Sequence, residues 1–214
     1  MPKTTRDAGV DGGQRRASFQ RARSHVTKQS LVQAATALWR TNGYAATTVA
    51  DICKAAGVSK ALFYFYFPRK EDVLLEVGAV STVEAQRVAK AMLDKPYEID
   101  AVITAVLASL ENVMRRSTPE LIIETVLEGY RQMLSGADHL QVTSAIFGDL
   151  FERARSDGKL PPHFSADDAR HLATVAQSLV SEGTPHWASG AYGARSFTDV
   201  VSRDISALIA GYAR

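Results

Sequence analysis

The 214-residue sequence predicts an all-α fold, with a small N-terminal helical domain followed by a larger helical domain. Three observations lead to this prediction. Apolar residues recur at helical spacing through most of the chain, and no segment alternates in the way that a half-buried strand does. Near the N-terminus, two short helical patterns are separated by a glycine-containing turn, which is typical of a helix-turn-helix. The later helical patterns are longer, and the breaks between them contain residues that favour turns.

The composition indicates a globular chain. Hydrophobic residues make up 46% of the sequence and charged residues 22%, which lies outside the range of disordered proteins. Cys53 is the single cysteine, so an intrachain disulfide and a cysteine-based zinc cluster are excluded. We expect Cys53 to be a small buried residue rather than a redox sensor. No apolar segment has the length of a signal peptide core or a bilayer-spanning helix, so we expect a cytoplasmic protein with no membrane contact.

Residues 1–23 are expected to form a flexible basic arm. They show almost no hydrophobic periodicity and are rich in Gly, Arg and Gln. The formal net charge of the chain is only +2, yet residues 1–25 carry six Lys and Arg residues against two Asp residues. Such a segment either contacts phosphate groups or is simply a solvated tail.

The first helix is expected to end near Thr41. Ser24 or Thr27 can act as its N-cap, and Gly43 is placed as a C-terminal stop. Its apolar residues recur at helical spacing: Leu31, Ala34, Ala35, Leu38 and Trp39.

The second and third helices are short. The second is expected to start at Thr48, where Thr48 and Asp51 have the spacing of a capping box, and to end before Gly57. Ser59 can cap a third helix that runs through Phe65.

Pro68 ends the small domain, because proline cannot continue a helix. We therefore assign residues 24–68 to the first domain, and residues 69–214 to the second. The expected helices of the second domain are 69–93, 99–116, 119–134, 138–157, 166–188 and 197–213.

Residues 47–74 read TTVADICKAAGVSKALFYFYFPRKEDVL. Together with Gly43 and Tyr44, this segment resembles the DNA-binding region of the TetR family of transcriptional regulators, and the resemblance is dense over residues 27–80. It implies a helix-turn-helix over residues 24–68 that binds an inverted-repeat operator in double-stranded DNA. It also implies that residues 69–214 bind a small-molecule effector and form a homodimer through the last two helices. Regulators of this kind, most often repressors, are not enzymes and need no cofactor.

The third helix has the pattern of a recognition helix. Such a helix places small or polar residues at its N-terminus against base edges and keeps an apolar inner side. Ser59, Lys60 and Ala61 meet the first requirement, while Leu62, Phe63 and Phe67 meet the second. Ala61 stands where the family commonly has glycine, and its methyl group either contacts a thymine methyl or narrows the set of tolerated bases.

Aromatic residues are concentrated in residues 63–67. We expect the phenylalanines of this segment to pack in the core. Tyr64 and Tyr66 are instead expected to place a ring on the core and a hydroxyl near a phosphate. The resemblance also implies that both tyrosines touch DNA.

Lys70 and Thr48 are further candidates for phosphate contacts. Lys70 is expected to begin the fourth helix, where its charge opposes the helix dipole unless an anion lies nearby. The family resemblance implies a phosphate contact there. Thr48 either offers its hydroxyl and N–H to phosphate or is a plain N-cap, and Arg69 either adds a phosphate contact or is solvated.

The effector site is expected among the middle helices. A mostly apolar lining, suited to a hydrophobic effector, could come from Met114, Tyr130, Met133, Phe147 and Phe151, although each of them taken singly is better explained as ordinary core. Asp167, Asp168 and His171 have a spacing that can bind a metal, but acidic residues in a first helical turn also complement the helix dipole, and no metal site is expected.

Two other functions are alternatives to a ligand-responsive regulator. A helical enzyme on the same scaffold needs convergent catalytic groups, and the sequence contains no Ser/His/Asp arrangement and no glycine-rich phosphate loop. A regulator without a small-molecule ligand needs no apolar cavity in the middle helices.

Overall fold

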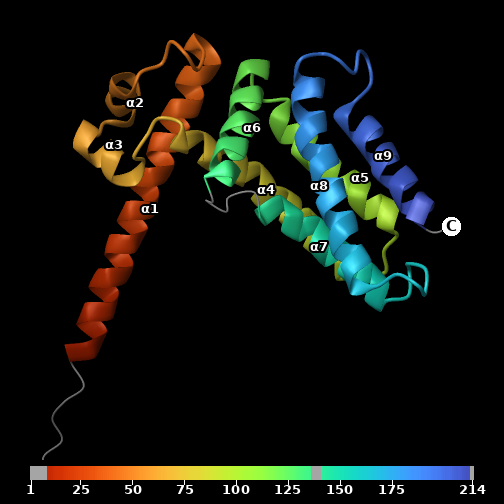
Figure 1. The fold of residues 1–214 in the computed structure, drawn as a ribbon. Coiled ribbons are helices and arrows are strands. Elements are labelled where there is room, and N and C mark those ends of the chain that lie inside the picture. The colour runs from red at the N-terminus through yellow and green to blue at the C-terminus, as the bar shows by residue number, and fades with distance from the viewer. Residues whose placement is uncertain (1–8, 136–140, 213–214) are drawn as a thin grey trace, which may run out of the picture. The chain divides into compact units, whose positions relative to one another are not determined.

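The computed structural model describes the backbone of residues 9–135 and 141–212, and every regular element in these ranges is an α-helix (Figure 1). The chain divides into two compact units, with unit 1 ending at Lys70 and unit 2 beginning at Glu71. An all-α fold with a helix-turn-helix near the N-terminus is therefore confirmed.

Unit 1 contains α1 (Gly9–Asn42), α2 (Val49–Ala56) and α3 (Lys60–Tyr66). The two short helices lie on the same side of α1, and α2 packs against both α1 and α3 (Figure 1). Cys53 of α2 is buried, as expected. The core of the unit is formed by fully or almost fully buried side chains from all three helices: Leu31, Ala35, Trp39, Ile52, Phe63 and Phe67.

Helix α1 begins well before the expected N-caps Ser24 and Thr27. Its backbone is helical from Gly9, so residues 9–23 of the expected flexible arm continue the helix, while residues 1–8 lie outside the described residues. Residues 9–23 are helical without hydrophobic periodicity, because Ala, Arg and Gln favour helix without any apolar face. A helix already fixed by packing at Leu31 and Trp39 also extends without a new nucleation cost.

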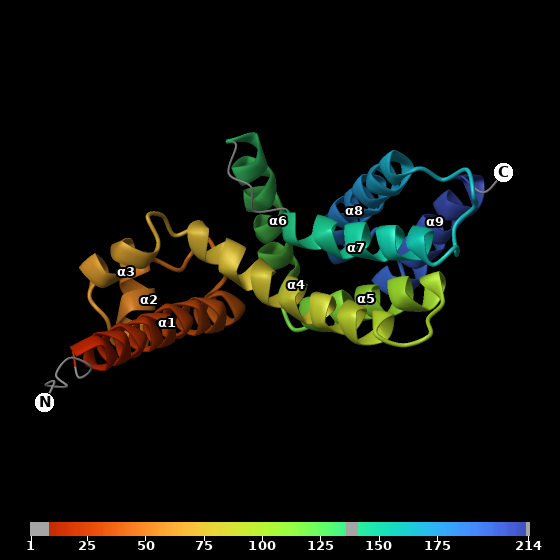
Figure 2. The same cartoon turned by 90° about the horizontal axis from the view of Figure 1, so that it is seen from below.

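Unit 2 contains six helices in the described ranges: α4 (Asp72–Leu93), α5 (Ile99–Met114), α6 (Pro119–Leu134), α7 (Gln141–Ser156), α8 (Ala166–Ala188) and α9 (Phe197–Tyr212). Helix α7 packs against α8 and α4 against α5, while α8 also contacts α6 and α9 (Figure 2). The expected spans 119–134 and 166–188 coincide with α6 and α8. Positions 138–140 of the expected span 138–157 lie outside the described residues.

The fourth helix starts at Asp72 and has Glu71 as its N-cap residue, so the expected start near Arg69 is wrong. Residues 68–70 form a bend instead. Two features favour the bend, because the ring of Pro68 restricts the backbone and the side chain of Lys70 is bonded to main-chain oxygens of unit 1.

A buried carboxylate joins α5 to α9 in unit 2. Glu111 accepts hydrogen bonds from the backbone N–H of Thr198, at 2.9 Å, and from its hydroxyl, at 2.6 Å, and it also pairs with Arg115. Burial disfavours the charged form, but these hydrogen bonds outweigh it and lower the pKa of Glu111 below its ordinary value. The ionised side chain therefore caps the first turn of α9 from another helix.

Candidate nucleic-acid interface

Helix α2 starts with the expected capping box. The backbone N–H of Asp51 donates to the hydroxyl of Thr48 at 3.2 Å, and the backbone N–H of Thr48 donates to the Asp51 carboxylate at 2.9 Å. The Thr48 hydroxyl also donates to this carboxylate, at 2.6 Å, and these bonds lower the pKa of Asp51. Thr48 is exposed and has an N-cap role in the structure.

A glycine turn positions α3 relative to α2. Gly57 ends α2 with a φ of +67°, in the left-handed region that other residues reach only at a cost. The next residue, Val58, donates its backbone N–H to the carbonyl of Cys53 at 3.0 Å. Ser59 then caps α3 by accepting the backbone N–H of Leu62 at 3.2 Å. Helix, left-handed glycine and capped helix together give the expected helix-turn-helix.

Ser59, Lys60 and Ala61 are all exposed at the N-terminal end of α3. The helix is held to the unit by Phe63 and Phe67, which are buried and whose ring centroids lie 5.7 Å apart. The tripeptide is therefore presented at the free end of a helix whose opposite side is anchored in the core.

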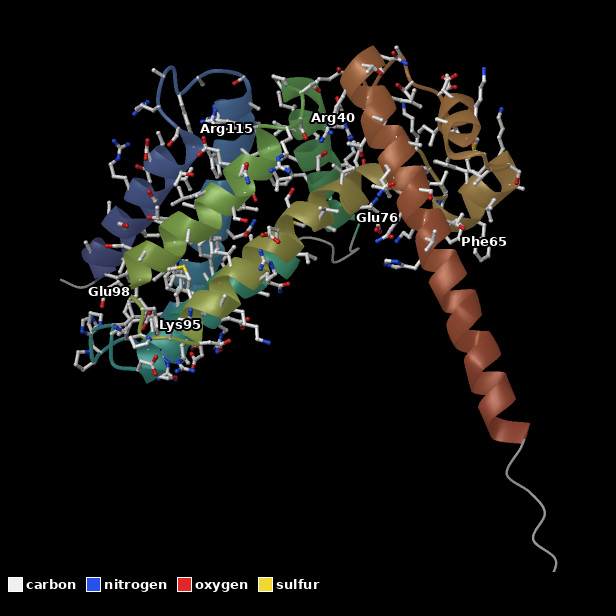
Figure 3. The ribbon with its side chains drawn as sticks, turned by 180° about the vertical axis from the view of Figure 1, so that it is seen from behind. Arg40, Phe65, Glu76, Lys95, Glu98 and Arg115 are labelled. Atoms are coloured by element: carbon white, nitrogen blue, oxygen red, sulfur yellow. The ribbon has the colours of Figure 1, made fainter. Side chains whose placement is uncertain are left out.

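Two apolar residues of α3 lie outside the core, contrary to expectation. Phe65 is 76% exposed and Leu62 is 36% exposed. The reason is geometric, because burial of Phe63 and Phe67 fixes one side of the helix and a residue two positions from Phe63 lies roughly opposite. Figure 3 shows Phe65 on the outer edge of α3. The 3.6-residue period of a helix, applied to Phe63 and Phe65, is enough to predict that the Phe65 ring is exposed when Phe63 is buried.

Tyr64 and Tyr66 differ in their surroundings. Tyr64 is 51% exposed, and its ring meets that of Phe63 edge-on, with 5.4 Å between centroids. Tyr66 is half-buried, and its hydroxyl donates to the hydroxyl oxygen of Ser24 in α1 at 3.0 Å. That contact joins residues far apart in the sequence, and no local pattern indicates it.

Lys70 is bonded within unit 1. Its ammonium group donates to the carbonyl oxygens of Tyr44 and Thr47, both at 3.1 Å, and lies 4.1 Å from the centroid of the Tyr44 ring. Lys70 precedes α4, and these carbonyl oxygens, rather than an anion, are the partners of its charge in the structure. An ammonium has three donors, and these two bonds fix the loop that leads into Thr48.

The five expected effector contacts have different surroundings in the described structure. Phe147 and Phe151 are fully buried and stack with their centroids 6.2 Å apart, and Met114 packs at the edge of the same core. Met133 is 49% exposed on α6. Tyr130 donates its hydroxyl to Glu182 of α8 at 2.7 Å, and burial together with this carboxylate raises the pKa of Tyr130 to about 12.

The acidic residues at the start of α8 have structural partners. Asp168 forms a capping box with Ser165, and Asp167 pairs with Arg170. The His171 ring lies 6.4 Å from that of Tyr212. Among the described residues, no three His, Cys, Asp or Glu side chains are grouped as metal ligands, and no described helix could span a membrane.

Comparison with known proteins identifies the N-terminal region. Residues 31–77, which include α2 and α3, match the family described as bacterial regulatory proteins, tetR family. The helix-turn-helix region of this chain therefore belongs to the TetR family. Within this family, a similar curated protein is the HTH-type transcriptional regulator EthR of Mycolicibacterium smegmatis, 44% identical over 48 residues. That match covers 22% of this chain and 22% of EthR.

The fold of most of the chain is shared with solved structures. FadR of Thermus thermophilus, a TetR-family repressor solved with lauroyl-CoA, has a TM-score of 0.70 and 21% identity, and the match covers 85% of this chain and 92% of that chain. FadR of Bacillus halodurans has a TM-score of 0.64 and 18% identity, over 86% of this chain and 95% of that one. At such identities the likeness concerns the fold.

Proposed function

We propose that this chain is a sequence-specific DNA-binding transcriptional regulator of the TetR family, in which unit 1 reads duplex DNA. The observation that carries the proposal is the exposed Ser59–Lys60–Ala61 tip of α3, held at the Gly57 turn and anchored by Phe63. A short helix with a free N-terminal end can enter the major groove and contact base edges. Thr48, Tyr64, Tyr66 and Lys70 are proposed to position the helix through phosphate contacts.

The regulator is proposed to act as a homodimer through α8 and α9. A single helix-turn-helix contacts few base pairs, whereas a two-fold dimer reads two half-sites about 34 Å apart in an inverted repeat. Leu172 and Ala176 of α8 and Ile205 of α9 are already buried within one chain. The proposed interface therefore uses the exposed side of these helices, where α9 has the small residues Ala207, Ala210 and Gly211.

The effector is proposed to be a small, largely hydrophobic molecule bound by unit 2. Support comes from the core around Phe147 and Phe151, and from the acyl-CoA compounds named with two similar structures, lauroyl-CoA with FadR of Thermus thermophilus and stearoyl-CoA with FadR of Bacillus subtilis. Release of the operator requires the effector to bind the DNA-incompetent arrangement more tightly. Repression in the cytoplasm, without enzymatic activity, fits this scheme.

Fluorescence anisotropy on duplexes from the region upstream of the gene tests the proposal. We expect tight binding of an inverted repeat at physiological salt, above the affinity for shuffled duplexes of the same composition. Failure to exceed non-specific binding on every upstream duplex would count against DNA recognition. Addition of an acyl-CoA series to the bound complex then tests the effector class, and no release by any member would favour a regulator without a small-molecule ligand.

A further inference from the structure

The side of α3 that faces away from the core is apolar. Ala61 and Phe65 are one helical turn apart on this side, and Leu62 lies next to them. All three are exposed, whereas the hydroxyl oxygen of Ser59 is engaged in capping the helix. We call Ala61, Leu62 and Phe65 the apolar face of α3. This face can donate no hydrogen bond to a base.

Neighbouring groups hold the apolar face in place. The Phe65 ring meets the Tyr66 ring edge-on at 5.1 Å between centroids, and Tyr66 is bonded to Ser24 of α1. The backbone N–H of Leu62 is fixed by the Ser59 cap. These contacts restrain the face before any ligand binds, so an exposed ring is retained in a defined orientation.

The helix-turn-helix also carries exposed cationic residues, one of which directly precedes the apolar face. Lys60 is the first residue of α3, and Lys54 is exposed on the last turn of α2. An apolar patch next to exposed ammonium groups suits a polyanion that also displays methyl groups. Double-stranded DNA has this chemistry, since the C5-methyl group of thymine projects into the major groove between two phosphate backbones.

We infer that the apolar face of α3 recognises thymine methyl groups, and that each operator half-site contains thymine at the positions that this face meets. The inference rests on the proposed function, because it specifies how unit 1 reads DNA. Recognition of this kind depends on shape and burial of the methyl group, with Lys60 and Tyr64 left to contact bases and phosphates at the flank of the helix.

The test begins by selecting duplexes from a random pool with the full-length protein. Each thymine of the enriched inverted repeat is then replaced singly by deoxyuridine, which keeps base pairing and removes only the methyl group. Burial of one methyl group contributes about 0.8 kcal/mol, so each contacted thymine should lose affinity about fourfold on replacement. Thymines outside the repeat should show no loss.

Variants connect the effect to the apolar face. In Leu62→Ala and Phe65→Ala, the deoxyuridine penalty should disappear at the thymine that the removed side chain contacted. Val83→Ala, which changes an exposed apolar residue on α4, should keep every penalty. Thermal unfolding of each variant verifies that it is folded, and these exposed positions are expected to tolerate alanine.

The outcomes separate this inference from the proposed function. An enriched repeat without thymine, or one whose thymines tolerate deoxyuridine, would overturn methyl recognition while leaving sequence-specific binding intact. Penalties that persist unchanged in both the Leu62 and the Phe65 variants would also overturn it. If the selection enriches no sequence at all, the proposed function itself fails and methyl recognition fails with it.

Discussion

The ammonium group of Lys70 donates a 3.1 Å hydrogen bond to the carbonyl oxygen of Tyr44 and lies over the ring of the same residue. Together with the bond to Thr47, this arrangement ties the end of unit 1 to the loop between α1 and α2. The same side chain that resembles a phosphate ligand therefore also supports the start of α2. Its two roles can be separated by experiment.

Lys70→Ala is expected to destabilise unit 1. The variant leaves two main-chain oxygens without this charged donor and removes a cation–π contact, so we expect a loss of about 1–3 kcal/mol in the free energy of unfolding. Urea denaturation followed by circular dichroism measures it. Lys90→Ala is the control, since Lys90 is exposed on α4, and equal stability of the two variants would show that the Lys70 contacts contribute nothing.

The same substitution is expected to weaken DNA binding nearly equally across sequences. If Lys70 contacts phosphate, the slope of log affinity against log salt falls by about one. Anisotropy titrations at several salt concentrations measure this slope. A weaker affinity with an unchanged slope would assign Lys70 to the support of the loop alone.

Phe63→Ala and Phe65→Ala are expected to differ sharply in stability. Phe63 is fully buried, so its truncation should cost about 3–5 kcal/mol, whereas Phe65 is 76% exposed and its truncation should cost about 0.5 kcal/mol or less. Chemical denaturation of the two variants provides the comparison. A large loss at Phe65 would contradict the exposure of its ring.

Gly57→Ala is expected to destabilise the helix-turn-helix without any steric clash. A Cβ at this position meets nothing within 4 Å, so the cost comes only from the φ of +67° and amounts to about 1–2 kcal/mol. Gly148→Ala on α7 is a matched control, because its added Cβ also meets nothing and the helix favours alanine. Thermal unfolding should separate the two, and comparable melting temperatures would argue against the left-handed turn.

Glu111→Gln is expected to destabilise unit 2 in a pH-dependent way. The folded-state pKa of Glu111 is lowered, so its stabilising contribution is fully present above the ordinary value of 4.5 and is lost as the pH falls through the folded-state pKa. At pH 7 the variant should lose about 1–3 kcal/mol in the free energy of unfolding. Urea denaturation of both proteins between pH 7 and pH 3 should show the difference shrinking in acid, and a constant difference would contradict the lowered pKa.

The sequence predicted the elements whose limits are set by local chemistry. The Thr48 capping box, the Gly57 stop and the Ser59 cap act within a few residues, and all three occur as expected. Long helices such as α6 and α8 were also predicted, because proline or serine marks where they begin. In each case the interaction that sets the limit of the helix joins residues that are close in the sequence.

Tertiary contacts set the features that the sequence could not predict. The start of α4 depends on Lys70 reaching the carbonyl of Thr47, and the environment of Tyr66 depends on Ser24. Neither contact produces a periodic pattern in the sequence. The effector contacts stay a prediction for a similar reason, since an apolar residue such as Phe147 looks the same in a sequence whether it lines a cavity or fills a core.

Cys53 provides a thiol reporter for unit 1. It is the single cysteine of the chain, it lies on the inner side of α2 with 4% of its surface exposed, and burial raises its pKa. Maleimide labelling should therefore require transient opening around α2, and the labelling rate should report that opening. Unit 2 contains no cysteine and does not contribute to the signal. A slower labelling of the Cys53 sulfur after a DNA duplex is added would measure how strongly DNA binding rigidifies unit 1. This measurement uses the native protein and needs no engineered probe.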